Sequence, residues 1–221
     1  MHSSLEKLNF IKAKVNEIIK TKQLKLDTQI VVISKTFPID NFEHLIKEGH
    51  SHFGENKVQE AYEKWSIIKN HYKNLKIHMV GKLQTNKVNK AVKIFDYIHS
   101  LDNEKLALKI SNQEKEVNKK IKLFIQVNLA NEDQKSGISP SELDGFYKFC
   151  VNDLHLNVVG LMCLPPANTS VNYFKKLNNY ANKLNLKHLS MGMSSDYENA
   201  VGNGSTFLRI GTAILGKRTI I

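Results

Sequence analysis

The sequence of 221 residues predicts an α/β protein built as a single (β/α)8 barrel, a TIM barrel, with an extra N-terminal helix. Short apolar, β-branched runs alternate with longer amphipathic segments, which is typical of parallel strands joined by crossover helices. We count about eight such runs, or about 28 residues for each strand and helix, as a compact barrel requires. The alternative is a doubly wound open sheet, which usually has fewer strands in this length.

The expected elements follow one another without a linker, so we expect one domain over residues 1–221. The strands are expected at 30–34, 50–53, 77–80, 97–100, 123–127, 158–162, 188–191 and 207–210, of which 50–53 is the weakest. The helices are expected at 5–20, 40–48, 57–69, 103–119, 141–151 and 170–183. Asp40 is expected to cap the second helix, and Ser139-Pro140 to open the fifth.

The composition is that of an ordinary globular protein, with 41% apolar and 24% charged residues. Cys150 and Cys163 form no C-x-x-C pair, so we expect neither a disulfide framework nor a structural zinc site. No apolar run approaches the roughly 18 residues of a membrane span. The first 20 residues alternate apolar and charged side chains, unlike a secretory signal, so we expect a cytoplasmic protein without membrane contact.

The formal net charge of +11 comes almost wholly from lysine, because only Arg209 and Arg218 among the 32 basic residues are arginine. The lysines are scattered and do not interleave with aromatic residues, so we expect no specific nucleic-acid partner. In such a chain Arg209 indicates a site that needs a planar guanidinium rather than a point charge. A chance surface arginine is the other interpretation.

The active sites of (β/α)8 barrels lie at the carboxyl ends of the strands, and Lys35 directly follows the first expected strand. Burial of its stem beside Val31 and Ile33 would lower the pKa of the ammonium and make a free amine available to attack an aldehyde. The alternative is a lysine whose charged head simply reaches solvent at the end of the strand.

An anion site is expected in the loops after the seventh and eighth strands, where barrels often bind phosphate. Ser194 and Ser195 supply hydroxyl and amide groups in one loop, with Ser195 also able to cap a short helix. Gly211 allows close approach of the backbone in the other loop, and Thr212 adds a hydroxyl. Plain helix capping and a tight turn would explain the same residues.

Arg209 lies two residues before Gly211, so a strand period of two directs both to the same face of the barrel. A guanidinium there can donate to a ring nitrogen and keep it unprotonated. Lys35, Arg209 and the anion loops together describe a site for pyridoxal 5′-phosphate (PLP). The His50-x-His52 pair lacks a third ligand at metal spacing, so no metal site is expected.

Several long motifs resemble those of a known family. In chain order they are VISKT from 32, FGENKVQE from 53, GKLQTNK from 81, QVN from 126, KSG from 135, GLM from 160, LSMGMSSD from 189 and RIGTA from 209. The sequence thereby resembles, over essentially its whole length, the YggS/PROSC family of PLP homeostasis proteins. The resemblance implies a barrel like the N-terminal domain of alanine racemase.

The resemblance also implies residue roles. It implies PLP held as an aldimine on Lys35, with Arg209 facing the pyridine nitrogen and Asn56 as a polar neighbour. The phosphate would be held by Ser194, Ser195, Gly211 and Thr212, and Lys135 would lie in a loop that influences PLP handling.

The family is regarded as PLP-binding regulators without established catalysis. The resemblance therefore implies a monomeric carrier, not an enzyme, that buffers PLP, maintains vitamin B6 and amino-acid homeostasis, and has PLP-dependent apoenzymes as transient recipients. The alternative is a weak PLP-dependent racemase of the alanine racemase type. Such racemases take a tyrosine from a separate C-terminal β-domain, and we expect no such domain after the eighth strand.

Overall fold

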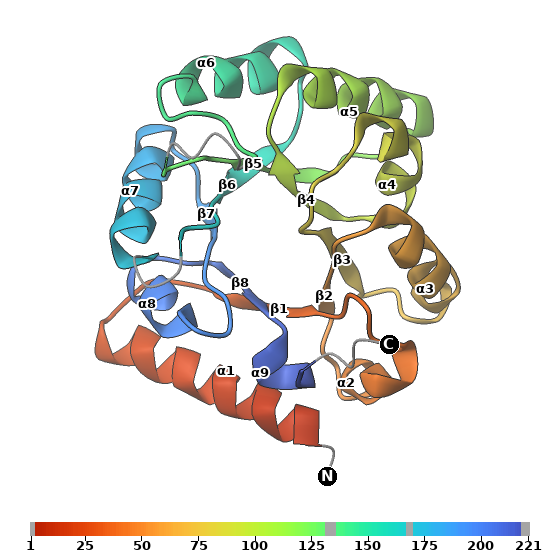
Figure 1. Ribbon diagram of the computed structural model, residues 1–221, viewed down its shortest axis with the longest axis vertical. Helices are drawn as coiled ribbons and strands as arrows, with labels where there is room; N and C mark the ends of the chain where they lie inside the picture. The colour runs from red at the N-terminus through yellow and green to blue at the C-terminus, as the bar shows by residue number, and fades with distance from the viewer. Residues whose placement is uncertain (1–2, 131–135, 167–169, 218–221) are drawn as a thin grey trace.

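The strands form a closed parallel barrel in which neighbours in sequence are neighbours in space and β1 pairs with β8. The structure is a computed structural model that describes residues 3–130, 136–166 and 170–217. Figure 1 shows the ring of strands with the helices around it, and the predicted (β/α)8 fold is confirmed. The strands are β1 Gln29–Ile33, β2 His52–Glu55, β3 Lys76–Met79, β4 Tyr97–Leu101, β5 Lys122–Gln126, β6 Val158–Met162, β7 His188–Ser190 and β8 Phe207–Ile210.

The helices cover the outside of the barrel, and the expected N-terminal helix is present as α1, packed against α8 and α9 (Figure 1). In the described residues they are α1 Ser3–Thr21, α2 Glu43–Lys47, α3 Val58–His71, α4 Val88–Ile94, α5 Glu104–Val117, α6 Leu143–Lys148, α7 Ser170–Lys183, α8 Tyr197–Gly202 and α9 Thr212–Leu215. None of these helices is long and apolar enough to cross a bilayer.

Alternation along each strand divides the apolar side chains into two layers. In β1, Ile30 and Val32 belong to the large core between strands and helices, whereas Val31 and Ile33 belong to the core inside the barrel. The interior core is small and aromatic: it consists of Val31, Ile33, Tyr97, Phe124, Met162 and Phe207. A filled interior makes the barrel a solid support, so a ligand site has to form at its mouth.

The second strand lies two residues later than predicted, so Gly54 and Glu55 belong to β2 instead of following it. Parallel pairing sets this register, with Gly54 opposite Ile33 on one side and His78 on the other. Gly and Glu have low strand propensity, but the propensity of a residue yields to its tertiary contacts. Here the Glu55 side chain is fully buried and paired.

Two predicted helix starts are wrong. Asp40 lies inside a short 3₁₀ helix, Ile39–Asn41, and α2 begins after Phe42 without a side-chain cap. Ser139-Pro140 precedes α6 by a turn in which the Ser139 hydroxyl donates to Glu142, so the helix begins at Leu143. Short polar side chains near a helix start bond to whichever neighbour the turn brings close. Two short helices were not predicted, namely α4 with seven residues and α9 with four.

Candidate functional site

A cavity of about 420 Å³ opens at the carboxyl ends of the strands, and all seven residues predicted to hold the cofactor line it. This volume is within the usual range of small-molecule pockets, about 300–1,000 Å³. Its lining consists of Ile33, Lys35, Asn56, Val80, Leu164, Met193, Ser194, Ser195, Arg209, Gly211 and Thr212. The eighth predicted residue, Lys135, lies outside the described residues.

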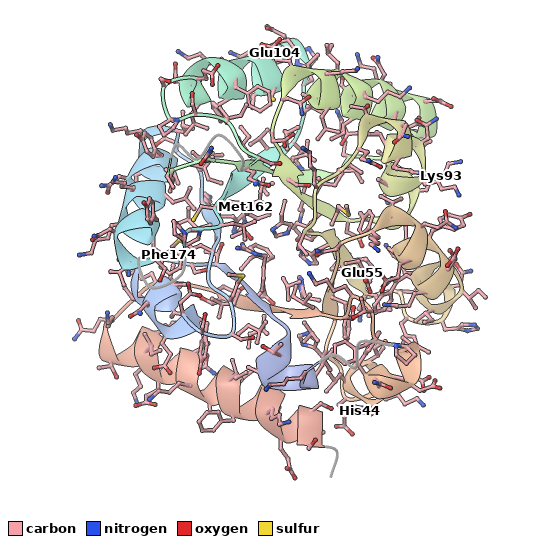
Figure 2. The ribbon with its side chains drawn as sticks, viewed as in Figure 1. His44, Glu55, Lys93, Glu104, Met162 and Phe174 are labelled. Carbon is pink, nitrogen blue, oxygen red and sulfur yellow. The ribbon has the colours of Figure 1, made fainter. Side chains whose placement is uncertain are left out.

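Lys35 is half-buried just beyond the end of β1, and a buried carboxylate fixes the residue before it. Glu55 Oε1 accepts hydrogen bonds from Ser34 Oγ at 2.8 Å, Lys64 Nζ at 2.9 Å and Trp65 Nε1 at 3.0 Å. Figure 2 shows Glu55 on the barrel wall beside α3, the helix that carries Lys64 and Trp65. Burial raises the pKa of the Glu55 carboxyl, and Lys64 opposes this rise.

Lys64 and its neighbour Glu60 also fix Thr36, the residue after Lys35. Lys64 Nζ donates to the Ser34 carbonyl at 2.9 Å and to Glu60 at 3.1 Å, and Glu60 accepts the amide of Thr36. Thr36 has φ +67°, a left-handed conformation that β-branched residues rarely adopt. The backbone on both sides of Lys35 is therefore fastened to α3. We call Glu55, Glu60, Lys64 and Trp65 the β1-loop clamp.

The two predicted anion loops are joined to each other. Gly192 has φ +91°, a conformation that favours glycine, and its carbonyl accepts the amide of Arg209 at 3.0 Å. Ser194 Oγ accepts the amide of Ala213 at 3.2 Å, which ties the loop after β7 to the first turn of α9. The amides of a first turn lack carbonyl partners within the helix, so Thr212 offers a backbone donor besides its hydroxyl.

Ser195 does not cap α8, contrary to the prediction. Asp196 precedes that helix, and its carboxylate accepts the amide of Met193 at 2.7 Å. This bond closes the turn that contains Ser194 and Ser195. The Ser195 side chain is exposed and lines the cavity.

Arg209 forms the floor of the cavity and is 5% exposed. Its guanidinium donates to Ser190 Oγ at 2.7 Å and to the Cys163 carbonyl at 2.9 Å. Burial lowers the pKa of Arg209, but an arginine remains protonated in proteins. Burial also raises the pKa of the Cys163 thiol to about 12, so this cysteine is a neutral thiol and a poor nucleophile at neutral pH.

A second cavity, of about 490 Å³, adjoins the first and was not predicted. The two cavities share Asn56, Val80 and Leu164, and the second is also lined by Lys82 and Tyr173. Tyr173 comes from α7, well after β6, so a search of the residues that directly follow the strands could not find it. Gly81 allows the close packing here, since a Cβ would lie 2.5 Å from the Asn56 carbonyl oxygen.

The chemistry of this lining fits a small phosphorylated aldehyde. Hydroxyl and amide donors gather at the loops after β7 and β8, as a phosphate needs. An amine lies at the end of β1, and the same cavity is lined by a buried guanidinium whose two terminal nitrogens are each bonded to the protein. In the described residues, no group of three His, Cys, Asp or Glu side chains is arranged to hold a metal ion.

Comparison with known proteins defines the class first. The family described as alanine racemase, N-terminal domain, matches residues 8–219. The alanine racemase of Clostridium difficile superposes with a TM-score of 0.71 at 15% identity, over 95% of this chain and 56% of that one. At that identity the likeness concerns the fold alone. The match over residues 8–219 shows that the chain belongs to the class of alanine racemase N-terminal-domain proteins.

Nearer relatives define the family within that class. The pyridoxal phosphate homeostasis protein of Haemophilus influenzae is 34% identical over 96% of this chain and 94% of its own length. That of Vibrio cholerae is 35% identical over 90% and 89%. PipY of Synechococcus elongatus, in its structure with PLP bound, is 32% identical with a TM-score of 0.80, over 91% of this chain and 100% of that one. The chain belongs to the family of pyridoxal phosphate homeostasis proteins.

Proposed function

We propose that the protein binds PLP in the cavity at the carboxyl ends of the strands, as a carrier that buffers the cofactor. The main observation in support is that one cavity is lined by Lys35, Asn56, Arg209 and the anion loops. The phosphate would contact Ser194, Ser195, Gly211 and Thr212, and Arg209 would face the ring nitrogen. The solved structure of PipY with PLP supports the cofactor.

Lys35 would hold the cofactor covalently. PLP supplies an aldehyde and an electron-withdrawing ring. Lys35 would supply the amine that condenses with this aldehyde, with loss of one water, and hydrolysis would reverse the link. The β1-loop clamp keeps the lysine backbone in place for this step.

Arg209 supports a carrier rather than an enzyme. The guanidinium only donates hydrogen bonds, so it favours a ring nitrogen without a proton. An unprotonated ring withdraws electrons weakly and stabilises a carbanion poorly, which suppresses general PLP chemistry. The protein would act as a monomer in the cytoplasm. It would release PLP from the barrel mouth to PLP-dependent apoenzymes.

Borohydride reduction followed by peptide mass spectrometry tests it. Protein incubated with PLP should carry one pyridoxyl group on the peptide that contains Lys35. Lys35→Ala should lose that adduct and the visible absorption band while keeping its circular dichroism spectrum. Lys82→Ala, a control in the adjoining cavity, should keep both. An adduct absent from the wild type, or placed only on other lysines, would refute the proposal.

A weak amino-acid racemase is the second candidate, and Tyr173 is the observation that favours it. A racemase needs a second proton carrier besides the lysine, and the phenol lines the cavity beside the cofactor site. Deuterium incorporation into alanine or serine in heavy water measures this activity. Incorporation that Tyr173→Phe abolishes would support the racemase, and incorporation at background level would support the carrier.

A further inference from the structure

Three histidines form a chain of hydrogen bonds inside the barrel. His52 Nδ1 lies 2.9 Å from His78 Nε2, and His78 Nδ1 lies 2.9 Å from His99 Nε2. His99 Nδ1 lies 2.7 Å from Ser190 Oγ, the atom that accepts a hydrogen bond from Arg209. The hydrogen-bond chain therefore leads from β2 through β3, β4 and β7 to the guanidinium of Arg209, which lines the proposed cofactor cavity.

The hydrogen-bond chain runs through the barrel interior from the amino ends of the strands to their carboxyl ends. His52 is the first residue of β2, at the amino ends of the strands, and is half-buried. His78, His99 and Ser190 are nearly or fully buried. Arg209 is the next-to-last residue of β8, at the carboxyl ends where the cavity opens. The chain thus connects the cofactor side of the barrel with its opposite side.

Aromatic rings insulate this chain. His78 stacks on Tyr97 and His99 on Phe124, both with centroids 4.3 Å apart. The Phe207 centroid lies 6.2, 5.8 and 6.1 Å from those of His52, His78 and His99. Burial lowers the pKa of all three histidines, that of His52 to about 4, so each is neutral at neutral pH.

Charged groups act on each histidine of the hydrogen-bond chain. Arg209 opposes a proton on His99 at one end. At the other end Lys76 and Lys122 oppose a proton on His52, and Asp27 and Asp96 favour one. In the middle, Lys69 opposes a proton on His78.

The arginine gives the chain a direction. Arg209 only donates, so Ser190 Oγ accepts from it and keeps its own hydrogen to donate. Among the described residues, the acceptor bonded to that hydroxyl is His99 Nδ1. A neutral imidazole that accepts at Nδ1 carries its proton at Nε2, so His99 donates to His78. His78 must then donate to His52 in the same way.

We infer that Ser190, His99 and His78 are positioning residues for Arg209, and that the arginine holds His99, His78 and His52 in one tautomer, protonated at Nε2. Ser190 Oγ is one fixed acceptor of the guanidinium, and the Cys163 carbonyl oxygen is the other. Together they keep the guanidinium plane in one orientation relative to the cavity. The role toward the ring nitrogen rests on the proposed function, whereas the tautomers do not.

Long-range ¹H–¹⁵N correlation spectra of the cofactor-free protein read the tautomers directly. At pH 7 we expect each of the three rings to be neutral, with the Nε2–H form in excess by about tenfold or more, which corresponds to about 1.4 kcal/mol. A His99 ring protonated at Nδ1, or a near-equal mixture, would overturn the inference. This measurement needs no variant.

Ser190→Ala tests the coupling. Removing the hydroxyl should shift both His99 and His78 toward a mixture of tautomers. Ser205→Ala is the matched control. Ser205 is also fully buried, but it donates to the Met191 carbonyl, which is not part of the histidine hydrogen-bond chain. Its spectrum should keep the wild-type tautomers. Unchanged tautomers in Ser190→Ala would overturn the inference.

Absorption of the PLP-loaded protein tests the role toward the cofactor. Ser190→Ala should shift the visible band and its pH profile, and Ser190→Thr, which restores a hydroxyl, should reverse the shift. A band that is the same in both variants and the wild type would overturn the positioning role. Failure of the wild type to bind PLP would instead refute the proposed function, with the tautomer spectra still readable.

Discussion

Glu55→Gln is the sharpest test of the β1-loop clamp. The substitution keeps the shape of the side chain and its acceptor Oε1, but it removes the negative charge opposite Lys64. It also places an amide in the position of Oε2, a buried atom without a hydrogen-bond partner in the described part of the chain. The variant therefore leaves a buried ammonium less compensated and adds a donor with no acceptor.

The expected loss follows from burial. The Glu55 side chain is 0% exposed and that of Lys64 is 10% exposed, so water screens the pair little. Breaking a buried ion pair by neutralising one partner costs about 3–5 kcal/mol. Lys64 retains Glu60 and the Ser34 carbonyl, which places the loss near the lower limit, at about 3 kcal/mol.

Urea unfolding followed by tryptophan fluorescence measures this loss. Trp65 is the single tryptophan of the chain and donates to Glu55, so the probe is inside the clamp. Glu43→Gln is the control, because its pair with Lys47 has side chains 40% and 59% exposed and should contribute less than about 1 kcal/mol. Equal losses in the two variants would refute a stabilising clamp.

Three further outcomes are expected. Arg209→Lys should keep the covalent adduct but shift its visible band, because an ammonium replaces the planar fork; an unchanged band would mean that Arg209 does not face the ring. Burial lowers the pKa of His50 to about 3 and that of His52 to about 4 in the folded protein. Below pH 6.5 the unfolded chain therefore binds more protons than the folded protein does. Stability should therefore fall with pH from 6.5 to about 4, by about 1.4 kcal/mol per pH unit for each histidine, and His50→Gln should flatten the slope in urea titrations. Gly192→Ala should lower the free energy of unfolding by about 1–3 kcal/mol, because φ is +91° and its Cβ would lie 2.5 Å from that of Ala200; an unchanged free energy of unfolding would contradict this strain.

Local pattern was enough to predict the barrel and the chemical groups at its mouth. The expected strand 158–162 matches β6 residue for residue, because a strand buried on both faces reads as a nearly unbroken apolar segment. The expected strand 207–210 also matches β8, although Arg209 interrupts its apolar run. The groups at or just beyond the carboxyl ends of the strands gather at one end of the barrel, because all its strands are parallel. Lys35, Arg209 and Gly211 therefore lie in one cavity.

Tertiary structure alone decided the features that depend on partners far apart in the chain. The register of β2 follows from pairing with β1 and β3 and from the burial of Glu55 against Lys64 of α3. The histidine chain exists because closure of the barrel brings Ser190 of β7 within 2.7 Å of His99 of β4. A strand period of two shows which residues share a face with His99. Hydrogen bonds across a closed barrel, however, have no signature in the local sequence.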